Sequence, residues 1–245
     1  MLSCKNRLSV LLALAVGLSG STTSAGQGRL NPASKYARSA QNPYFVDCGA
    51  KPPYSSHSAR SAVLLSPDGK RSAFAQASAH GGNGHCANTS KVFVASHSTH
   101  YKLAFLQVPT DMLLGNGVRL IDWSKDGTQL LFDVLLWQWG SDAPPSSEIW
   151  IYNADTGVFK RLPLTGQIAS FGEGCLVSVD PLGFTAVGKV AVRLTASQYL
   201  EPGETRPSAC SSETQVWLFD PRTNQVARTS SDYSVPRWGK PLERH

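Results

Sequence analysis

After residue 25 the sequence has no apolar run long enough to cross a membrane as a helix. The one marked apolar run, residues 8–18, follows Lys5 and Arg7 and is succeeded by small residues that end in TSA at 23–25. A basic start, a short apolar stretch and small residues before the cleavage point are typical of a secretory signal peptide. We therefore predict an exported protein, secreted or periplasmic, that has no membrane span once residues 1–25 are removed.

Cysteine is scarce, and no C-x-x-C spacing occurs, which argues against a redox-active or zinc-binding motif. Of the five cysteines, Cys4 lies in the predicted signal peptide, which leaves Cys48, Cys86, Cys175 and Cys210. An even number of cysteines in an oxidising compartment predicts two disulfides, for which three pairings exist.

Acidic residues are few, 17 against 23 lysines and arginines, and the basic residues are scattered. Cleavage after Ala25 removes two basic residues and no acidic one, so the formal net charge falls from +6 to +4. Scattered positive charge indicates a solvated surface, and we expect no nucleic-acid partner. The chain also has no G-x-S-x-G nucleophile motif. We assign no catalytic residue.

Helical periodicity is missing beyond residue 25, and a repeated strand-and-turn pattern takes its place. The turn SPDGK (66–70) recurs as SKDG (124–127) and, more weakly, as DPLG (180–183). An apolar strand follows each turn, KVFVA (91–95), EIWIY (148–152) and QVWLF (215–219), and only the third lies farther from its turn, because of an insertion at 197–213. Asp-Gly turns between apolar runs indicate β-hairpins, and a fixed repeat indicates a repeat architecture. The sequence therefore predicts an all-β protein.

Each repeat predicts a four-stranded antiparallel meander, separated from the next by 56 to 67 residues. The predicted strands are 60–65, 71–77, 90–96 and 101–108 in the first repeat, 118–123, 128–137, 147–152 and 158–163 in the second, and 175–180, 184–195, 214–219 and 225–230 in the third. A four-stranded unit of this period is a β-propeller blade.

The turns at 66–70 and 124–127 and the strands at 149–152 and 216–219 resemble the blade repeats of TolB-type, WD-repeat-like periplasmic propellers. The resemblance covers about residues 60–230 and implies three blades. Because propellers close with four to eight blades, two arrangements are open: a homodimer that forms a six-bladed ring, or an open three-bladed wedge whose edges the chain termini cover. The expected organisation is a signal peptide (1–25), a leader with a short strand at 44–48 (26–58), the blades (59–230) and a C-terminal tail (231–245).

The meander places tight turns at one end of the blades and long connections at the other. Binding sites occur on variable loops held by a rigid scaffold, so we predict a site at the long-loop end. The candidate binding residues are Trp139, Asp142, His80, His85 and Glu173.

Three cysteines also map to the long-loop end. Cys175 and Cys210 fall in the same repeat, so we expect them to pair, which leaves Cys48 to pair with Cys86. His97 and His100 fall at the opposite end from His80, so we expect no metal site and no cofactor.

The leading functional hypothesis is a module that binds a protein or peptide. The alternative is a carbohydrate-binding or lyase-type propeller that uses Trp139 with nearby carboxylates. Propeller blades serve several activities, so the resemblance does not choose between them.

Overall fold

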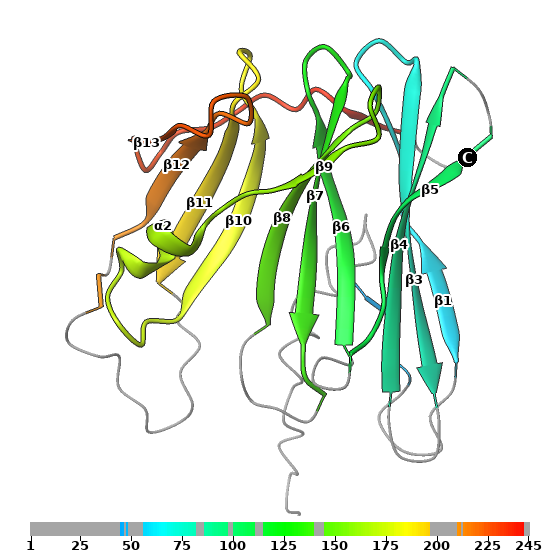
Figure 1. Cartoon of the computed structure of the whole chain (residues 1–245), viewed down its shortest axis with the longest axis horizontal. Coiled ribbons are helices and arrows are strands. Elements are labelled where there is room, and N and C mark those ends of the chain that lie inside the picture. The colour runs from blue at the N-terminus through cyan, green and yellow to red at the C-terminus, as the bar shows by residue number, and fades with distance from the viewer. Residues whose placement is uncertain are drawn as a thin grey trace, which may run out of the picture. The chain divides into compact units, whose positions relative to one another are not determined.

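The computed structural model describes residues 45–46, 48, 56–81, 86–97, 100–110, 115–139, 145–196, 210–211 and 213–242. All of them belong to one compact unit, Asn31–His245. They form three antiparallel sheets and a short helix, so the predicted all-β class is confirmed (Figure 1). No helix of these residues is long and apolar enough to cross a membrane.

Each sheet corresponds to one sequence repeat. Sheet 1 contains β1 (His57–Arg60), β2 (Val63–Leu65), β3 (Arg71–Gly81), β4 (Cys86–Ser96), β5 (Lys102–Gln107) and β14 (Lys240–Leu242). Sheet 2 contains β6 (Gly115–Trp123), β7 (Gln129–Trp137), β8 (Ser146–Asn153) and β9 (Phe159–Arg161). Sheet 3 contains β10 (Val177–Phe184), β11 (Val190–Ala196), β12 (Gln215–Phe219) and β13 (Val226–Thr229), and helix α2 (Thr165–Ala169) lies between β9 and β10.

Sheets 2 and 3 are four-stranded meanders, as predicted. In sheet 1 both β1 and β2 pair with β3, so together they form one interrupted first strand of the same meander. Sheet 1 gains a further strand, β14, from the C-terminal end of the chain. The described strands therefore form blade-like sheets, and these sheets do not close into a ring.

Sheet 2 lies between the other two sheets and is buried on both faces. Along β7, Leu130 and Phe132 pack into an apolar cluster shared with sheet 1, whereas Leu131 packs into one shared with sheet 3. Successive strand residues point to opposite faces, so a strand between two sheets requires apolar side chains at consecutive positions. The run QLLFDVLLW at 129–137 meets that requirement. Trp123 is fully buried in the first cluster.

The turn predicted at 180–183 in the third repeat is wrong. Pro181 and Gly183 lie inside β10, on either side of a bulge in its pairing with β11. The first turn of sheet 3 is instead at 185–189, where the hydroxyl of Thr185 accepts a hydrogen bond from the backbone N–H of Lys189. The three turns share one hydrogen bond, from a glycine N–H to the carbonyl three residues earlier: Gly69 to Ser66, Gly127 to Ser124 and Gly188 to Thr185.

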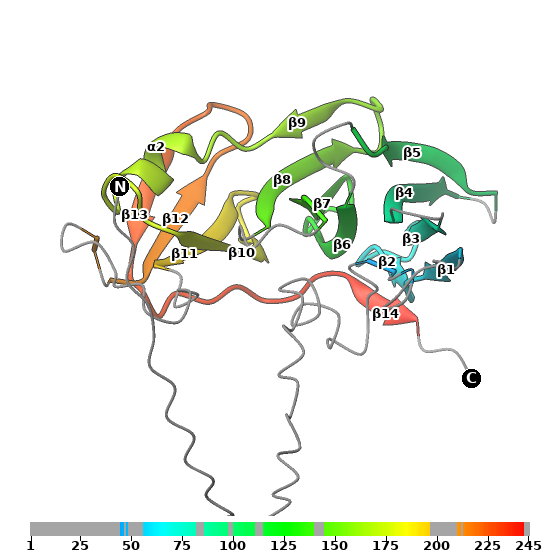
Figure 2. The ribbon, with the colours of Figure 1, turned by 90° about the horizontal axis from the view of Figure 1, so that it is seen from below.

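The C-terminal segment, residues 231–242, runs across the first strands of all three sheets (Figure 2). The indole N–H of Trp238 donates to the carbonyl of Phe184 in β10 (2.9 Å). The guanidinium of Arg237 donates to the carbonyl of Ile121 in β6 (2.6 Å). The segment then becomes β14, which pairs antiparallel with β2. One stretch of chain thus connects three sheets at their first strands.

Asp122 in β6 holds this segment in place. Its fully buried carboxylate accepts backbone N–H bonds from Trp123 (2.9 Å), Trp238 (3.1 Å) and Gly239 (2.7 Å). The segment passes close to Asp122 at Gly239, where a Cβ would come within 3.1 Å of the same carboxylate and would force a neighbour to shift. Burial raises the pKa of Asp122, and the N–H groups of Gly239 and Trp238 only partly offset this effect.

We predict that Asp122→Ala lowers the free energy of unfolding by about 3 kcal/mol, because the variant leaves buried backbone N–H groups without an acceptor. Urea denaturation at neutral pH measures the loss. The control is Asp180→Ala, which removes a half-exposed carboxylate from an ion pair and is expected to change stability by about 1 kcal/mol or less. Equal losses in the two variants would contradict this role for Asp122.

Asp122 also predicts a pH dependence. Because the pKa of Asp122 is raised in the folded state, the folded protein binds this proton more tightly than the unfolded chain does, and protonation stabilises the fold. This contribution is fully present below the unfolded pKa and is lost as the pH rises through the folded pKa. The wild type should therefore become less stable relative to Asp122→Asn as the pH rises above 4. Urea midpoints of both proteins at a series of pH values measure this change. A difference that stays constant with pH would contradict it.

Candidate functional site

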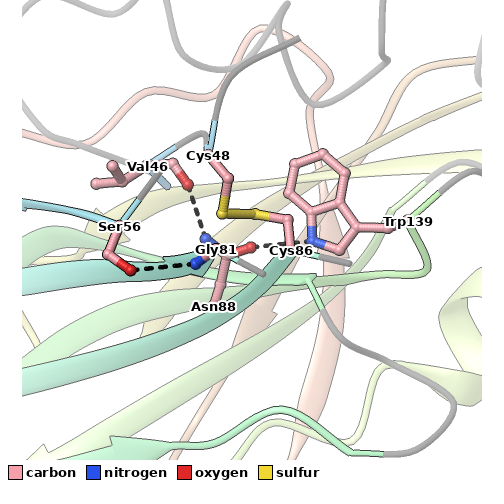
Figure 3. Close-up of a disulfide and its surroundings, with 7 residues drawn as sticks. All are labelled: Val46, Cys48, Ser56, Gly81, Cys86, Asn88 and Trp139. Carbon is pink, nitrogen blue, oxygen red and sulfur yellow. Dashed lines mark hydrogen bonds between the residues drawn. A yellow bond between two sulfur atoms is a disulfide. The ribbon is translucent and has the colours of Figure 1, made fainter. Parts of the chain in front are cut away.

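The long-loop end carries the disulfide Cys48–Cys86 (Figure 3). This pairing is the one expected from sequence, and it ties the segment before sheet 1 to the first residue of β4. The strand expected at 44–48 is not found in the described part of that segment, because Phe45, Val46 and Cys48 belong to no strand. Instead, Phe45 packs edge-on against Trp137, and Val46 accepts a hydrogen bond from the Asn88 side chain (2.7 Å).

Trp139 is a predicted binding residue that packs beside this disulfide. Its indole N–H donates to the side-chain oxygen of Asn88 (3.2 Å), and its ring contacts Trp137 edge-on. The ring also packs with the Cys48–Cys86 cluster (Figure 3). Both the polar and the apolar parts of Trp139 are therefore engaged in holding the loop end together, and less of the ring is free to stack on a ligand.

Two of the other predicted binding residues, His80 and Glu173, are among those that the structure describes. His80 is exposed near the end of β3 in sheet 1, and Glu173 is exposed in the connection between α2 and β10. Asp142 and His85 lie outside the described residues. Within the described ranges no group of three or more His, Cys, Asp or Glu side chains is placed to hold a metal ion.

The second disulfide, Cys175–Cys210, joins the connection after α2 to the segment before β12, again as expected. Next to it, the backbone N–H of Ser211 donates to the carbonyl of Phe171 (2.8 Å), whose side chain is buried in the core between sheets 2 and 3. This hydrogen bond therefore attaches the segment before β12 to a residue of that core.

A pocket of about 410 Å³ lies at the tight-turn end, opposite to the predicted site. Residues 124–126 and Gln129 of sheet 2 form one side of the pocket, and residues 186–188 and 221–222 of sheet 3 form the other. The pocket was not predicted, because a third turn at 180–183 separates residues 186–188 from the other tight turns. The threonine and glycine at 185 and 188, spaced like Ser124 and Gly127, were the available signal.

The pocket contains charges of both signs. Burial alone would raise the pKa of Asp126, but hydrogen bonds from Ser124 (2.5 Å) and Thr128 outweigh it and hold this pKa below its ordinary value. Lys125 and Arg222 contribute positive charge. The Arg222 guanidinium lies beside Asp220, at 3.4 Å. The side-chain oxygen of Gln129 is buried and has no hydrogen-bond partner within the described residues.

The outer face of sheet 1, the face turned away from sheet 2, is a second exposed feature. Phe74 stacks on Phe93 and contacts Tyr101 edge-on, each at 4.8 Å between ring centroids. The Arg60 guanidinium lies 3.4 Å from the centre of the Phe74 ring, a cation–π contact.

At the edge of that face lies β5. A bulge in its pairing with β4 places Leu103 opposite Phe93 and Leu106 opposite Lys91, so both leucines share the outer face. Leu103 is 50% exposed, Leu106 47% and Val108, just after the strand, 49%.

No protein-family model matches the chain, and no curated protein is significantly similar to it.

Removal of the first disulfide by Cys48→Ala with Cys86→Ala is predicted to cost about 3–4 kcal/mol of unfolding free energy, from the entropy of a loop that spans 38 residues. Urea denaturation measures this loss. The Nε1–H NMR signal of Trp139 should shift as well, because the ring packs on this disulfide. The matched control is Cys175→Ala with Cys210→Ala, whose 35-residue separation predicts a similar loss but no shift of that signal. An unchanged Trp139 signal in the first variant would contradict the contact.

Proposed function

We propose that this chain is an exported protein of the TolB-like propeller type whose role is to bind another protein through the exposed edge strand β5. The blade-like meanders and their repeated turns support the propeller type. The two disulfides are compatible with an extracellular or periplasmic location. The observation that carries the binding role is the edge of sheet 1 at β5, which pairs with no further strand among the described residues.

Sheet edges offer unpaired backbone groups, and proteins limit this hazard with short or charged edge strands. The last strand of sheet 2, β9, has three residues, and that of sheet 3, β13, has four. The corresponding strand of sheet 1, β5, has six residues and carries two half-exposed leucines. An extended partner segment that pairs with a free edge gains backbone hydrogen bonds, and alternate side chains give specificity.

The charge around β5 indicates the kind of segment that fits. Between residues 56 and 107 the only acidic residue is Asp68, and the basic residues are Arg60, Lys70, Arg71, Lys91 and Lys102. A second copy would bring the same positive charge to this edge. A segment in which apolar and acidic residues alternate would instead cover the leucines and meet Lys91 and Lys102. The occupant we propose is such a segment of a different protein.

We predict that the protein selects peptides with alternating apolar and acidic residues from a random phage-displayed library. Fluorescence anisotropy with a selected peptide should show binding at least tenfold weaker to Leu103→Ser with Leu106→Ser, which removes the apolar contacts without adding charge. Val158→Ser, at a residue that is 61% exposed just before β9, should bind within twofold of the wild type. Binding should also weaken with added salt.

Two results would overturn this proposal. Selected peptides that bind the β5 variant as tightly as the wild type would exclude β5 as the site. A wild-type dimer in light scattering that becomes a monomer in the β5 variant would assign the edge to a second copy of this chain.

A further inference from the structure

The pocket between sheets 2 and 3 has a closed counterpart between sheets 1 and 2. There the two tight turns touch: a Cβ on Gly127 would come within 3.2 Å of both Ser66 and Asp68. The equivalent glycine of sheet 3, Gly188, has nothing within 4 Å of the same position. The second pair of turns is therefore farther apart than the first, and the pocket lies in the space between them.

Arg71 lies across the closed junction. Its guanidinium donates to the carbonyl of Gly127 (3.2 Å) and to the carboxylate of Asp155, both in turns of sheet 2. The Arg71 side chain is only 11% exposed. A buried guanidinium thus joins the turns of sheets 1 and 2.

Gln129 occupies the position of Arg71 at the open junction. Both residues follow the turn serine by five positions, and the backbone N–H of each donates to that serine's hydroxyl at 2.9 Å. Glutamine is shorter than arginine and carries no charge. Its side-chain oxygen is a buried acceptor with no donor among the described residues, and a buried acceptor without a donor is unfavourable.

Arg222 occupies the position of Asp155. The backbone N–H groups of Asp155 and Arg222 each donate to the side-chain oxygen two residues earlier, at 3.0 and 2.9 Å. At this position the closed junction has a negative charge, that of Asp155, whereas the open junction has the positive charge of Arg222. Because the Arg71 guanidinium ends on Asp155, a guanidinium at the same place in the open junction would meet the Arg222 cation, and an anionic group fits there instead.

We propose that the pocket binds an arginine with a free carboxylate, as the amino acid or as the C-terminal residue of a peptide. The ligand crosses the junction as the Arg71 side chain does in the first junction but in the opposite direction, so that its guanidinium donates to Gln129 and Asp126 on the sheet 2 side. The carboxylate pairs with Arg222.

Three further observations agree with this ligand. The hydrogen bonds that Asp126 accepts from Ser124 and Thr128 all go to one carboxylate oxygen, Oδ1. The planar guanidinium of arginine can donate to two acceptors at once, and it stays positively charged at any pH of interest. The volume of about 410 Å³ lies at the small end of the range for ligand pockets.

NMR titration of the full-length mature protein tests the proposal, with L-arginine, argininamide, L-lysine and a peptide that ends in Gly-Arg as ligands. L-Arginine should shift the backbone signals of Gln129 and Gly188 and bind at least fivefold more tightly than argininamide or L-lysine. The peptide compared with L-arginine shows which source of the C-terminal arginine is preferred.

Two variants test the named contacts. Asp126→Asn should weaken arginine binding at least fivefold, whereas its matched control Asp68→Asn should not, because Asp68 makes the same serine bond (2.6 Å) in the first turn, outside the pocket. Gln129→Arg with Arg222→Asp reproduces the pair Arg71 and Asp155, so it should abolish binding while the melting temperature stays equal or rises.

The proposal fails if L-arginine causes no shifts at millimolar concentration. It also fails if argininamide binds as tightly as L-arginine, because the free carboxylate would then be irrelevant. Binding of inorganic phosphate with no binding of L-arginine would assign the pocket to anions held by Lys125 and Arg222, and would equally overturn it. None of these results bears on β5, which lies in another sheet.

Discussion

The arrangement of the three sheets depends on the contact between the C-terminal segment and the buried carboxylate of Asp122. The first strand of each sheet is an edge, and a propeller that closes into a ring needs more blades than these three. The C-terminal segment supplies partners for those edges: β14 for β2, backbone N–H groups for Asp122 and the Trp238 indole for Phe184. A single segment thus stabilises edges that the missing blades would otherwise protect. Of the two arrangements that the repeat count left open, the wedge covered by a chain terminus accounts for this contact; a ring completed by a second copy stays a hypothesis.

The molecule's most specific features lie where the repeats differ from one another. Arg71 and Gln129 have the same backbone environment, yet one bridges two sheets and the other leaves a buried acceptor beside a pocket. The edge strands diverge in the same way, since β9 and β13 are short and β5 is longer and more apolar. Equivalent positions of the three sheets can therefore be compared. A contact or a short edge strand that is present in one sheet shows what another sheet lacks.

Much of the fold could be predicted from sequence because its signals are local. Asp-Gly turns between apolar strands predicted the hairpins of sheets 1 and 2, and the two-sided apolar run at 129–137 fits a central strand. The first turn of sheet 3 was misplaced because DPLG at 180–183 looks like a turn, whereas its proline and glycine surround a bulge. The disulfide partners followed from assigning each cysteine to a repeat. The predicted binding site stays a prediction: Trp139 contacts Asn88 and Trp137, and its other described members, His80 and Glu173, lie in β3 and in the connection between α2 and β10.

The sequence by itself determined the strands, most of the turns and the order of the blades, because turn chemistry and side-chain alternation act over a few residues. Only the tertiary structure decided how the first strands of the sheets are covered and where a pocket lies. Asp122 and Gly239 are 117 residues apart, and the two walls of the pocket come from different sheets. Contacts of that range depend on how whole sheets pack, and no short stretch of sequence records them.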